Sequence, residues 1–390
     1  MRPVIYLHPA KQNAIRRGHP WVFPKAIGRH SGELVTGGLV EVLSSEGERV
    51  GTGVYNEHSL YRVRMLAYAF EAINTDTIAD IVSYRLKQAG LLRDCVNLPN
   101  QHTTAYRLFN SEGDGLSGLT IDRFNQICVV SSTAYWVEAS KDIISQCLKA
   151  TIPVERIIWL AQAKSLAQDG WQATLHDEIE GVEQVSEAGI LYQVDFSNTQ
   201  KTGLFLDQRE NHQRIAALAA GKRVLDLYTY TGGFALHAAK AGAIAVTAVD
   251  SSAQAIALAT QNAHLNGLEF IEFIAADARD YLVNAGDYDL VILDPPKLVP
   301  SQRHLERAKN YYRFLHRETF KHMKSGSLLL TCNCSSALSA QEFSELVCMQ
   351  AIAAGKTVRM LGIFGPASCH PTLPAFPEGH YLTAVLLAIV

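Results

Sequence analysis

Two short segments of the sequence hold side chains that can do chemistry together. Asp294 opens the segment DPPK directly after the apolar run Leu290–Leu293, and the pair Cys332 and Cys334 follows the apolar run Ser327–Thr331. If these runs are neighbouring strands of an open α/β sheet, their carboxyl ends meet at the crevice where such sheets bind ligands. The spacing therefore predicts that a carboxyl group, held rigidly by two prolines, faces a thiol across one crevice.

An acid and a thiol at one site suit methyl transfer to carbon 5 of a pyrimidine. That carbon becomes nucleophilic after a thiolate adds to carbon 6, and a nearby acid stabilises the charge that develops on the ring. A free thiol has a pKa of about 8.5, so the site must favour the thiolate. Alternation along a strand puts Cys332 and Cys334 on one face, so the spacing leaves open which of them reacts.

The remaining cysteines are expected to be small buried side chains: Cys95, Cys128, Cys147, Cys348 and Cys369. The C-x-C pair has no second Cys/His pair at metal-ligand spacing in the sequence, so no metal site is expected. Seven cysteines, an odd number in a long chain, favour a reduced, cytoplasmic protein.

The stretch VLDLYTYTGGFALHAAKAGAIAVTAVD, which ends at Asp250, predicts a strand, a glycine turn, a helix and a second strand. Gly232 and Gly233 allow close backbone approach to a ligand, and Asp250 follows at the spacing of a carboxylate that binds ribose hydroxyls. Tyr228 and Tyr230 stand where a dinucleotide-binding turn has glycines. The turn therefore disfavours a pyrophosphate and a hydride-transferring dehydrogenase, and suits a nucleoside that bears an amino acid.

The alternation of helices and strands continues on both sides of this stretch. Phe270–Ala275 predicts another strand, which ends before Asp277. On the amino-terminal side, a helix is expected to begin near Asp207. Asp207 could cap that helix together with Glu210, or Asp207 and Arg209 could contact a ligand, and the residue types leave both open.

The first 32 residues are strongly basic, although the net charge of the chain is −3. They contain no acid and six basic residues: Arg2, Lys11, Arg16, Arg17, Lys25 and Arg29. Short apolar runs separated by glycines follow, up to about residue 68, and predict a small β-barrel or sandwich. A basic surface on such a domain is the footprint expected of a nucleic-acid contact. From charge alone, an ordinary solvated surface is an equal alternative.

The middle of the chain predicts a small α+β domain without chemistry of its own. Thr75–Leu92 has the apolar spacing of an amphipathic helix, and the segment YRLFNSEGDGLSGLTIDRF predicts short strands joined by tight turns. Glu112, Asp114 and Asp122 within it are expected to be structural. The domains expected from these patterns are 1–70, 71–188 and 189–390.

The composition excludes several classes of protein. Hydrophobic residues make up 48% and charged residues 19% of the 390 residues, which predicts folded domains with sizeable cores. No apolar run approaches the roughly 18 residues of a membrane span, so no membrane partner is expected. An exposed strand of the middle domain could pair two chains, so a homodimer is one expectation.

Several motifs in order resemble one family. VLDLYTYTGGF, the acid of TAVD, DPPKL and TCNCS resemble the class I S-adenosylmethionine-dependent RNA methyltransferases, and specifically the ribosomal RNA large subunit methyltransferase I type. KTGLFLDQREN, the tail HPTLPAFPEGHYL and RRGHPWVF, which is similar to the start of a PUA-type RNA-binding domain, extend the likeness over nearly the whole chain. The resemblance implies a Rossmann-like methyltransferase sheet, a PUA-like β-barrel at the N-terminus and a small α+β domain between them.

The resemblance also implies roles for particular residues. It makes Cys334 the nucleophile and places Asp294 at the methyl-transfer centre. The implied product is 5-methylcytosine in 23S ribosomal RNA, which is expected to be methylated before the subunit is fully assembled. S-adenosylmethionine is the implied cofactor, with Asp250 at its ribose and Asp277 at its adenine amino group. The other residues expected around it are Asp226, Tyr228, Tyr230, Gly232, Gly233, Asp207 and Arg209, and those expected at the RNA are Arg16, Arg17, Lys25 and Lys297.

Alternatives remain open at this point. Lys297 stands where many 5-methylcytosine enzymes carry a second cysteine, and a scheme with one cysteine also fits a 5-methyluridine methyltransferase. Lys297 likewise disfavours an adenine amino-group methyltransferase, which would stack the base on an aromatic residue at that place. From another class, the chain could be a non-catalytic RNA-binding assembly factor that keeps the methyltransferase fold.

Overall fold

The computed structural model describes residues 2–172, 181–198, 204–298 and 305–390. They form two compact units. Unit 1 contains Met1–Gly181 and Cys369–Gly379, and unit 2 contains Val182–Ser368 and His380–Val390. The chain therefore leaves unit 2 near its C-terminus, contributes eleven residues to unit 1 and returns, which the sequence did not indicate.

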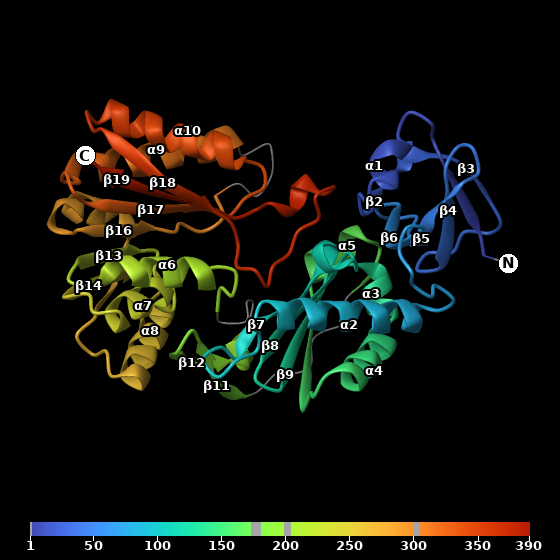
Figure 1. Ribbon diagram of the computed structural model, residues 1–390, viewed down its shortest axis with the longest axis horizontal. Coiled ribbons are helices and arrows are strands. Elements are labelled where there is room, and N and C mark those ends of the chain that lie inside the picture. Colours follow the sequence, from blue (N-terminus) through green and yellow to red (C-terminus); the bar gives the residue numbers. More distant parts are fainter. Residues whose placement is uncertain (1, 173–180, 199–203, 299–304) are drawn as a thin grey trace. The chain divides into compact units, whose positions relative to one another are not determined.

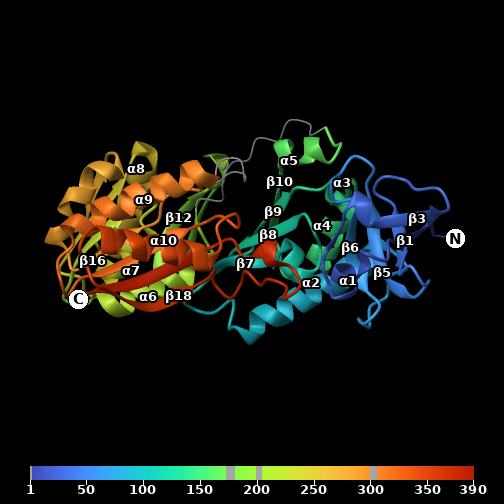
Figure 2. The ribbon, with the colours of Figure 1, turned by 90° about the horizontal axis from the view of Figure 1, so that it is seen from above.

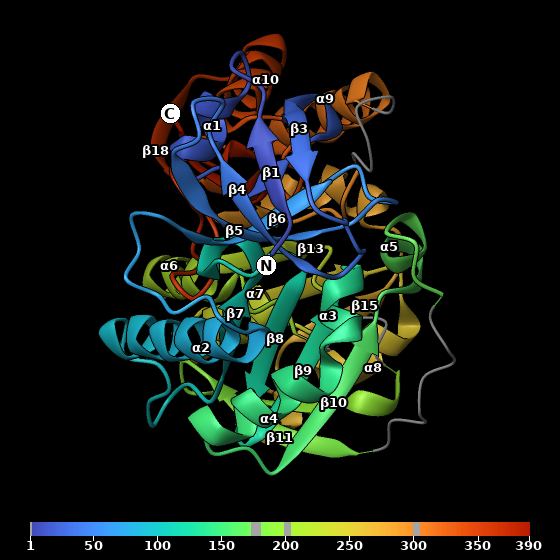
Figure 3. The same cartoon turned by 90° about the vertical axis from the view of Figure 1, so that its right-hand side faces the viewer.

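Unit 1 contains two sheets (Figures 1 and 3). The first has six strands in the order β2-β6-β5-β4-β1-β3, and the second has four in the order β10-β9-β8-β7. In chain order the elements are β1 (Val4–Leu7), α1 (Gln12–Arg16), β2 (Trp21–Val22), β3 (Ile27–Ser31), β4 (Leu39–Leu43), β5 (Arg49–Tyr55), β6 (Val63–Tyr68), α2 (Ile78–Cys95), β7 (Ala105–Asn110), β8 (Leu119–Phe124), β9 (Ile127–Ser132), α3 (Tyr135–Ala139), α4 (Lys141–Thr151), β10 (Arg156–Ala161) and α5 (Ala163–Gln168).

The six-stranded sheet is the small β-domain expected from the glycine-separated runs. Alternate residues of its strands, among them Ile5, Val40 and Val42, form one buried cluster. Gly51 of β5 is required by this packing, because a Cβ there would lie 2.2 Å from the backbone carbonyl oxygen of Ala67 on β6. The glycine at position 51 is thus explained by the close approach of β5 and β6.

The two N-terminal domains expected from the sequence form a single unit here. Buried ion pairing joins them: Arg64 lies 3.1 Å from Asp169, and both side chains are at most 7% exposed. Trp21 Nε1 also donates a hydrogen bond to Glu112. The boundary expected at residue 188 lies in the turn between β11 and β12, a hairpin that groups entirely with unit 2.

Acidic side chains of the middle segment are structural, as expected. Arg93 and Asp114 form a salt bridge whose side chains are 1% and 4% exposed. Arg107 pairs with Asp122. Helices α2 and α4 lie side by side on one face of the four-stranded sheet (Figure 3). Asp114 thus neutralises the buried Arg93, and Asp122 neutralises the partly buried Arg107.

Unit 2 is built on a seven-stranded sheet in the order β15-β14-β13-β16-β17-β19-β18 (Figures 1 and 2). The first five strands are parallel to one another. β19 runs antiparallel to β17, and the edge strand β18 runs antiparallel to β19. In chain order the elements are β11 (Val182–Glu187), β12 (Ile190–Asp195), α6 (Arg209–Ala219), β13 (Arg223–Leu227), α7 (Gly233–Lys240), β14 (Ala245–Asp250), α8 (Ala253–Asn266), β15 (Glu272–Ala275), β16 (Leu290–Leu293), α9 (Leu305–His322), β17 (Leu328–Asn333), α10 (Ala340–Ala353), β18 (Val358–Phe364) and β19 (Thr383–Ile389).

Helices cover both faces of this sheet, as expected of a doubly wound α/β fold. α9 and α10 lie beside each other on one face and bury Leu315 and Phe343 against strand residues such as Leu293 (Figure 2). α6 and α7 pack together on the other face. The strand order changes direction at β13, which is the place where open α/β sheets bind ligands.

Candidate active site

A cavity of about 560 Å³ lies in unit 2 at the carboxyl ends of β13, β14 and β16. The turn after β13, the residues that follow β16, and Cys334 after β17 all contribute to its wall. Four acidic residues also line it: Glu187, Asp207, Asp250 and Asp294. A cavity of this size with these groups suits a nucleoside ligand that carries positive charge.

The glycine turn forms one wall of the cavity. Tyr228 and Tyr230 have φ angles of 68° and 50°, a region that bulky side chains rarely adopt, and Gly232 follows with φ of 89°. The cost of this conformation is offset by Asp226 below the turn, whose Oδ2 accepts hydrogen bonds from Thr229 Oγ1 at 2.6 Å and from the Ala235 N–H at 3.0 Å. Strain held in this way is typical of a ligand-binding turn.

Asp226 itself is fully buried beneath the turn and does not line the cavity. Burial raises the pKa of Asp226 to about 6. Its carboxyl group therefore orders the turn and reaches a ligand only through the residues that it holds. Of the turn residues expected near the cofactor, Tyr228, Tyr230 and Gly233 line the cavity, and Gly232 is the N-cap of α7.

The two other acids assigned to the nucleoside have different positions. Asp250 lies in the cavity wall at the end of β14, and its carboxylate accepts hydrogen bonds from the backbone N–H groups of Tyr230 and Ser252. Asp277 is the N-cap of the 3₁₀ helix Ala278–Asp287 and is paired with Arg279, outside the cavity wall. The structure brings Asp250 to the cavity and leaves Asp277 beyond its edge.

The strands that end in Asp294 and the two cysteines are neighbours, as expected. Leu293 of β16 pairs with Thr331 of β17, so Asp294 stands beside Cys332 at the same level of the sheet. Burial, together with the nearby carboxylates of Asp207 and Asp226, raises the pKa of Asp294 to about 7. Near neutral pH this carboxyl group is thus divided between its acid and its ionised form.

The structure distinguishes the two cysteines. β17 continues to Asn333, so Cys332 is a strand residue, 1% exposed and outside the cavity wall, and burial raises its pKa well above the ordinary value. Cys334 follows the strand, is partly exposed and lines the cavity, with Sγ 4.0 Å from the carbonyl oxygen of Pro295. A ligand in the cavity can reach the thiol of Cys334.

The start of α6 differs from the expectation that Asp207 caps this helix. The helix begins at Arg209 with Gln208 as its N-cap and no side-chain cap, so the capping prediction for Asp207 is wrong. Asp207 instead lines the cavity and accepts a hydrogen bond from Tyr381 Oη at 2.8 Å. Arg209 is buried against Glu210 and does not reach the cavity wall.

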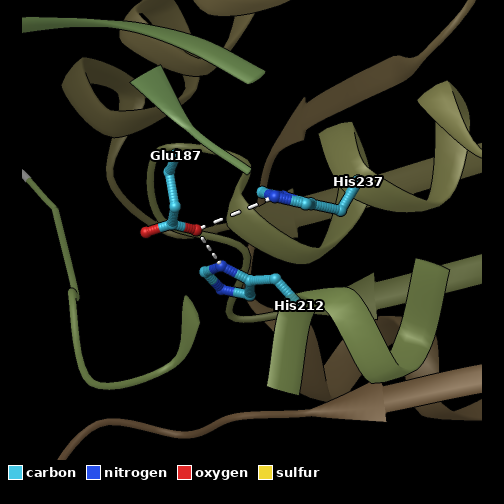
Figure 4. Close-up of side chains that lie close together, drawn as sticks. All are labelled: Glu187, His212 and His237. Carbon is cyan, nitrogen blue, oxygen red and sulfur yellow. Dashed lines mark hydrogen bonds and ion pairs between the residues drawn. The ribbon is translucent and has the colours of Figure 1, made fainter. Parts of the chain in front are cut away.

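A buried cluster that the sequence did not indicate lies beside the cavity (Figure 4). His212 Nδ1 is 2.7 Å from Glu187 Oε1, and His237 Nε2 is 3.8 Å from the same oxygen. Two ligands about 2 Å from one tetrahedral ion lie more than roughly 3 Å apart, so the short contact indicates a shared proton and not an ion site. These residues lie on β11, α6 and α7 and belong to no common motif, so only the fold brings them together.

The surroundings of Glu187 in this cluster favour its ionised form. Burial alone would raise the pKa of Glu187, but His212 and His237 hold it below the ordinary value. Burial lowers the pKa of His237 to about 4. Glu187 therefore remains ionised at the cavity wall, where it adds to the negative charge of the cavity.

The basic residues expected at RNA are exposed. Arg16 ends α1 and pairs with Glu48 at 2.9 Å, while Arg17 and Lys25 are exposed nearby in the chain. Lys297 is exposed at the cavity of unit 2. Of the helices in the described ranges, none is long and apolar enough to cross a membrane.

Comparisons with known proteins agree with this geometry. The family described as S-adenosylmethionine-dependent methyltransferase matches residues 165–357, and the PUA-like domain family matches residues 5–68. The ribosomal RNA large subunit methyltransferase I of Aeromonas hydrophila subsp. hydrophila is 34% identical over 398 residues, which cover 99% of each chain. That of Alteromonas mediterranea is 33% identical over 399 residues, which cover 100% of this chain and 99% of the relative.

Solved structures show the same fold. A protein from Streptococcus mutans described as a SAM-dependent methyltransferase has a TM-score of 0.79 at 21% identity, and the match covers 100% of both chains. SMU.776, described as a methyltransferase complexed with SAH, has a TM-score of 0.80 at 20% identity over 100% of both chains.

Proposed function

Because the chain belongs to the ribosomal RNA large subunit methyltransferase I family and uses S-adenosylmethionine, we propose that it methylates carbon 5 of a cytidine in 23S ribosomal RNA. The observation that supports this target most is the pairing of Asp294 and Cys334 in the wall of one cavity. A methyltransferase acting on an exocyclic amine or a ribose hydroxyl would not need a thiol there.

The residues of the cavity fit the cofactor. S-adenosylmethionine supplies an electrophilic methyl group on a positively charged sulfur, and four carboxyl groups line the cavity that would receive it. Asp250 has the position and chemistry to bind the ribose hydroxyls. The turn Tyr228–Gly233 would border the amino-acid end, while Asp207 and Glu187 supply further negative charge.

The proposed reaction assigns separate steps to the two catalytic residues. The Cys334 thiolate forms a bond to carbon 6 of the cytosine, and Asp294 gives a proton to N3 as electrons move onto the ring. Carbon 5 then takes the methyl group. A base removes the proton from carbon 5, the double bond between carbons 5 and 6 re-forms, the thiolate leaves and Asp294 regains its proton.

RNA recognition is proposed for both units. Residues 1–70 would dock RNA through Arg16, Arg17 and Lys25, with residues 71–188 as a structural middle domain. Residues 189–390 would perform the reaction, with Lys297 at the phosphates of the target nucleotide. The target base must leave its stack to reach the thiol, so RNA before full subunit assembly is the proposed substrate. A homodimer is not required by this scheme.

The test supplies unmodified 23S ribosomal RNA and labelled cofactor to the wild type and to two single variants, followed by digestion to nucleosides. We expect 5-methylcytidine from the wild type and from Cys332→Ala, and no product from Cys334→Ala. RNA that contains 5-fluorocytidine should remain covalently attached to the wild type, because fluorine cannot leave as the carbon 5 proton does. 5-Methyluridine as the product, or full activity in Cys334→Ala, would overturn the proposal.

A further inference from the structure

Three side chains, from the N-cap of α6 to its middle, connect Asp294 to the protein surface by hydrogen bonds. Arg214 Nη1 donates to Asn211 Oδ1 at 3.1 Å, and Asn211 Nδ2 donates to Gln208 Oε1 at 2.6 Å. Gln208 Nε2 donates to Asp294 Oδ2 at 3.0 Å. The three residues are three positions apart, so they lie on one side of the helix.

Arg214, at the surface end of this series of hydrogen bonds, determines which group donates in each of them. An amide oxygen and nitrogen have similar shapes, but a guanidinium group can only donate. Arg214 therefore requires Oδ1 of Asn211 on its side, and the Asn211 Nδ2 also faces the carbonyl oxygen of Gly365 at 3.4 Å. With its Nδ2 turned inward, Asn211 requires the oxygen of Gln208, and the Gln208 N–H is left to face Asp294.

Burial makes this arrangement hard to reverse. Asn211 is 0% exposed and Gln208 is 4% exposed. Turning either amide over would place two oxygens or two N–H groups against each other without water to compensate, which is costly in a buried network. The orientation of the Gln208 amide is therefore a property of the fold.

We propose that Arg214, Asn211 and Gln208 are positioning residues that present an N–H to Oδ2 of Asp294, so that Oδ1 holds and delivers the proton during methyl transfer. The inference rests on the role proposed above for Asp294. Gln208 makes the contact, and the other two residues act through it. The chain explains how a carboxyl group that must give and regain one proton keeps that proton on one oxygen.

Other groups around Asp294 also affect its protonation, and the substitutions of Asn211 and Arg214 used below leave these groups in place. The carboxylates of Asp207 and Asp226 favour its acid form, and His212 favours its ionised form. The thiol of Cys332 borders both Asp294 and Gln208. The Gln208 N–H favours the ionised form, so removal or reversal of this bond has a defined direction.

Two substitutions of Asn211 distinguish reversal of the Gln208 amide from simple loss of the hydrogen bond between Asn211 and Gln208. In Asn211→Asp the new side chain only accepts, so Gln208 must turn its N–H toward it and present its oxygen to Asp294. That oxygen favours the acid form, and the pKa of Asp294 should rise by about one pH unit. Asn211→Leu removes the amide but offers no acceptor, so nothing draws the Gln208 N–H away from the Asp294 carboxylate, which itself favours a donor.

The pKa of Asp294 is read in two ways. The first is the titration of ¹³C-labelled aspartate carboxyl groups without RNA, with the Asp294 signal identified by its absence in Asp294→Asn. The second is the alkaline limb of kcat for methyl transfer. We expect both to move up by about one pH unit in Asn211→Asp and to stay at the wild-type value in Asn211→Leu. No shift in Asn211→Asp, or equal shifts in both variants, would overturn the inference.

The carboxyl titration keeps this result separate from the proposed function, because it needs neither RNA nor product. Should Asn211→Asp fail to fold, Arg214→Glu places the acceptor at the surface end, where the Arg214 side chain is 37% exposed. Arg214→Met is its control. A higher Asp294 pKa in the Glu variant than in the Met variant supports the inference, and equal values refute it.

Discussion

Replacing Asp294 with asparagine should make the protein more stable while it abolishes methyl transfer. Burial raises the pKa of this carboxyl group from the ordinary 3.8 to about 7, so the folded protein binds a proton that the unfolded chain has released. Folding stability therefore falls as the pH rises from about 4 to about 7 and is level above that range. Asparagine carries no charge at any pH and can still accept the Gln208 hydrogen bond.

The size of this change in stability follows from the pKa of Asp294 in the unfolded chain, 3.8, and in the folded protein, about 7. The raised pKa of Asp294 should cost about 4 kcal/mol of folding stability at pH 8, where the buried group is ionised. At pH 5, where folding instead takes up a proton, the cost should be about 1.5 kcal/mol. The advantage of Asp294→Asn should thus grow by roughly 2.5 kcal/mol between these pH values. Groups elsewhere titrate in both proteins, so the difference between the two curves isolates Asp294.

Urea unfolding of wild type and variant at pH 5 and pH 8 measures this difference. Asp289→Asn is a matched control, since it makes the same chemical change at the other end of β16. The backbone N–H of Arg223 and the Lys324 ammonium hold the pKa of Asp289 below its ordinary value, so this variant should lose stability at both pH values. An Asp294→Asn advantage that is the same at pH 5 and pH 8 would refute the argument that burial of this charge is costly.

Three further predictions follow from other parts of the chain. Asp250→Asn should weaken cofactor binding by about 10-fold or more, because one charged acceptor for the ribose is lost, and calorimetry at constant pH measures the change. Arg93→Leu should destabilise unit 1 by about 3–5 kcal/mol, because Asp114 is left charged and buried, and the double variant with Asp114→Leu should recover part of this loss. Arg17→Glu should reduce RNA affinity and the steepness of its salt dependence more than Arg16→Glu, because Arg16 is already paired with Glu48, and equal effects in filter binding would count against RNA docking there.

Much of the fold of unit 2 could be predicted because its signals are local. Alternating apolar strands and helices, with glycines at the turn after β13, identify the doubly wound sheet and the edge at which it binds ligands. The chemistry of Asp294 followed from its place at the end of a buried strand. Contacts between distant segments had no such signal, so the sequence did not indicate that residues 369–379 belong to unit 1.

The choice between the two cysteines shows where local pattern fails. Strand alternation puts Cys332 and Cys334 on one face, but β17 pairs with β19 as far as Asn333. Cys332 is therefore held within the sheet, while Cys334 lies beyond its end, at the cavity. How far a strand extends depends on its partner, which is a tertiary property.

By itself the sequence determined which chemical groups this protein has and which ends of which strands they follow, because residue type and periodicity are written in the chain. Tertiary structure alone decided how those groups behave. Burial between α6, β16 and β17 gives Asp294 a pKa of about 7, and the same packing sets Gln208 against it in one orientation. Both effects depend on exclusion of water and on distances of about 3 Å between side chains that lie 86 positions apart, and no local pattern reports them.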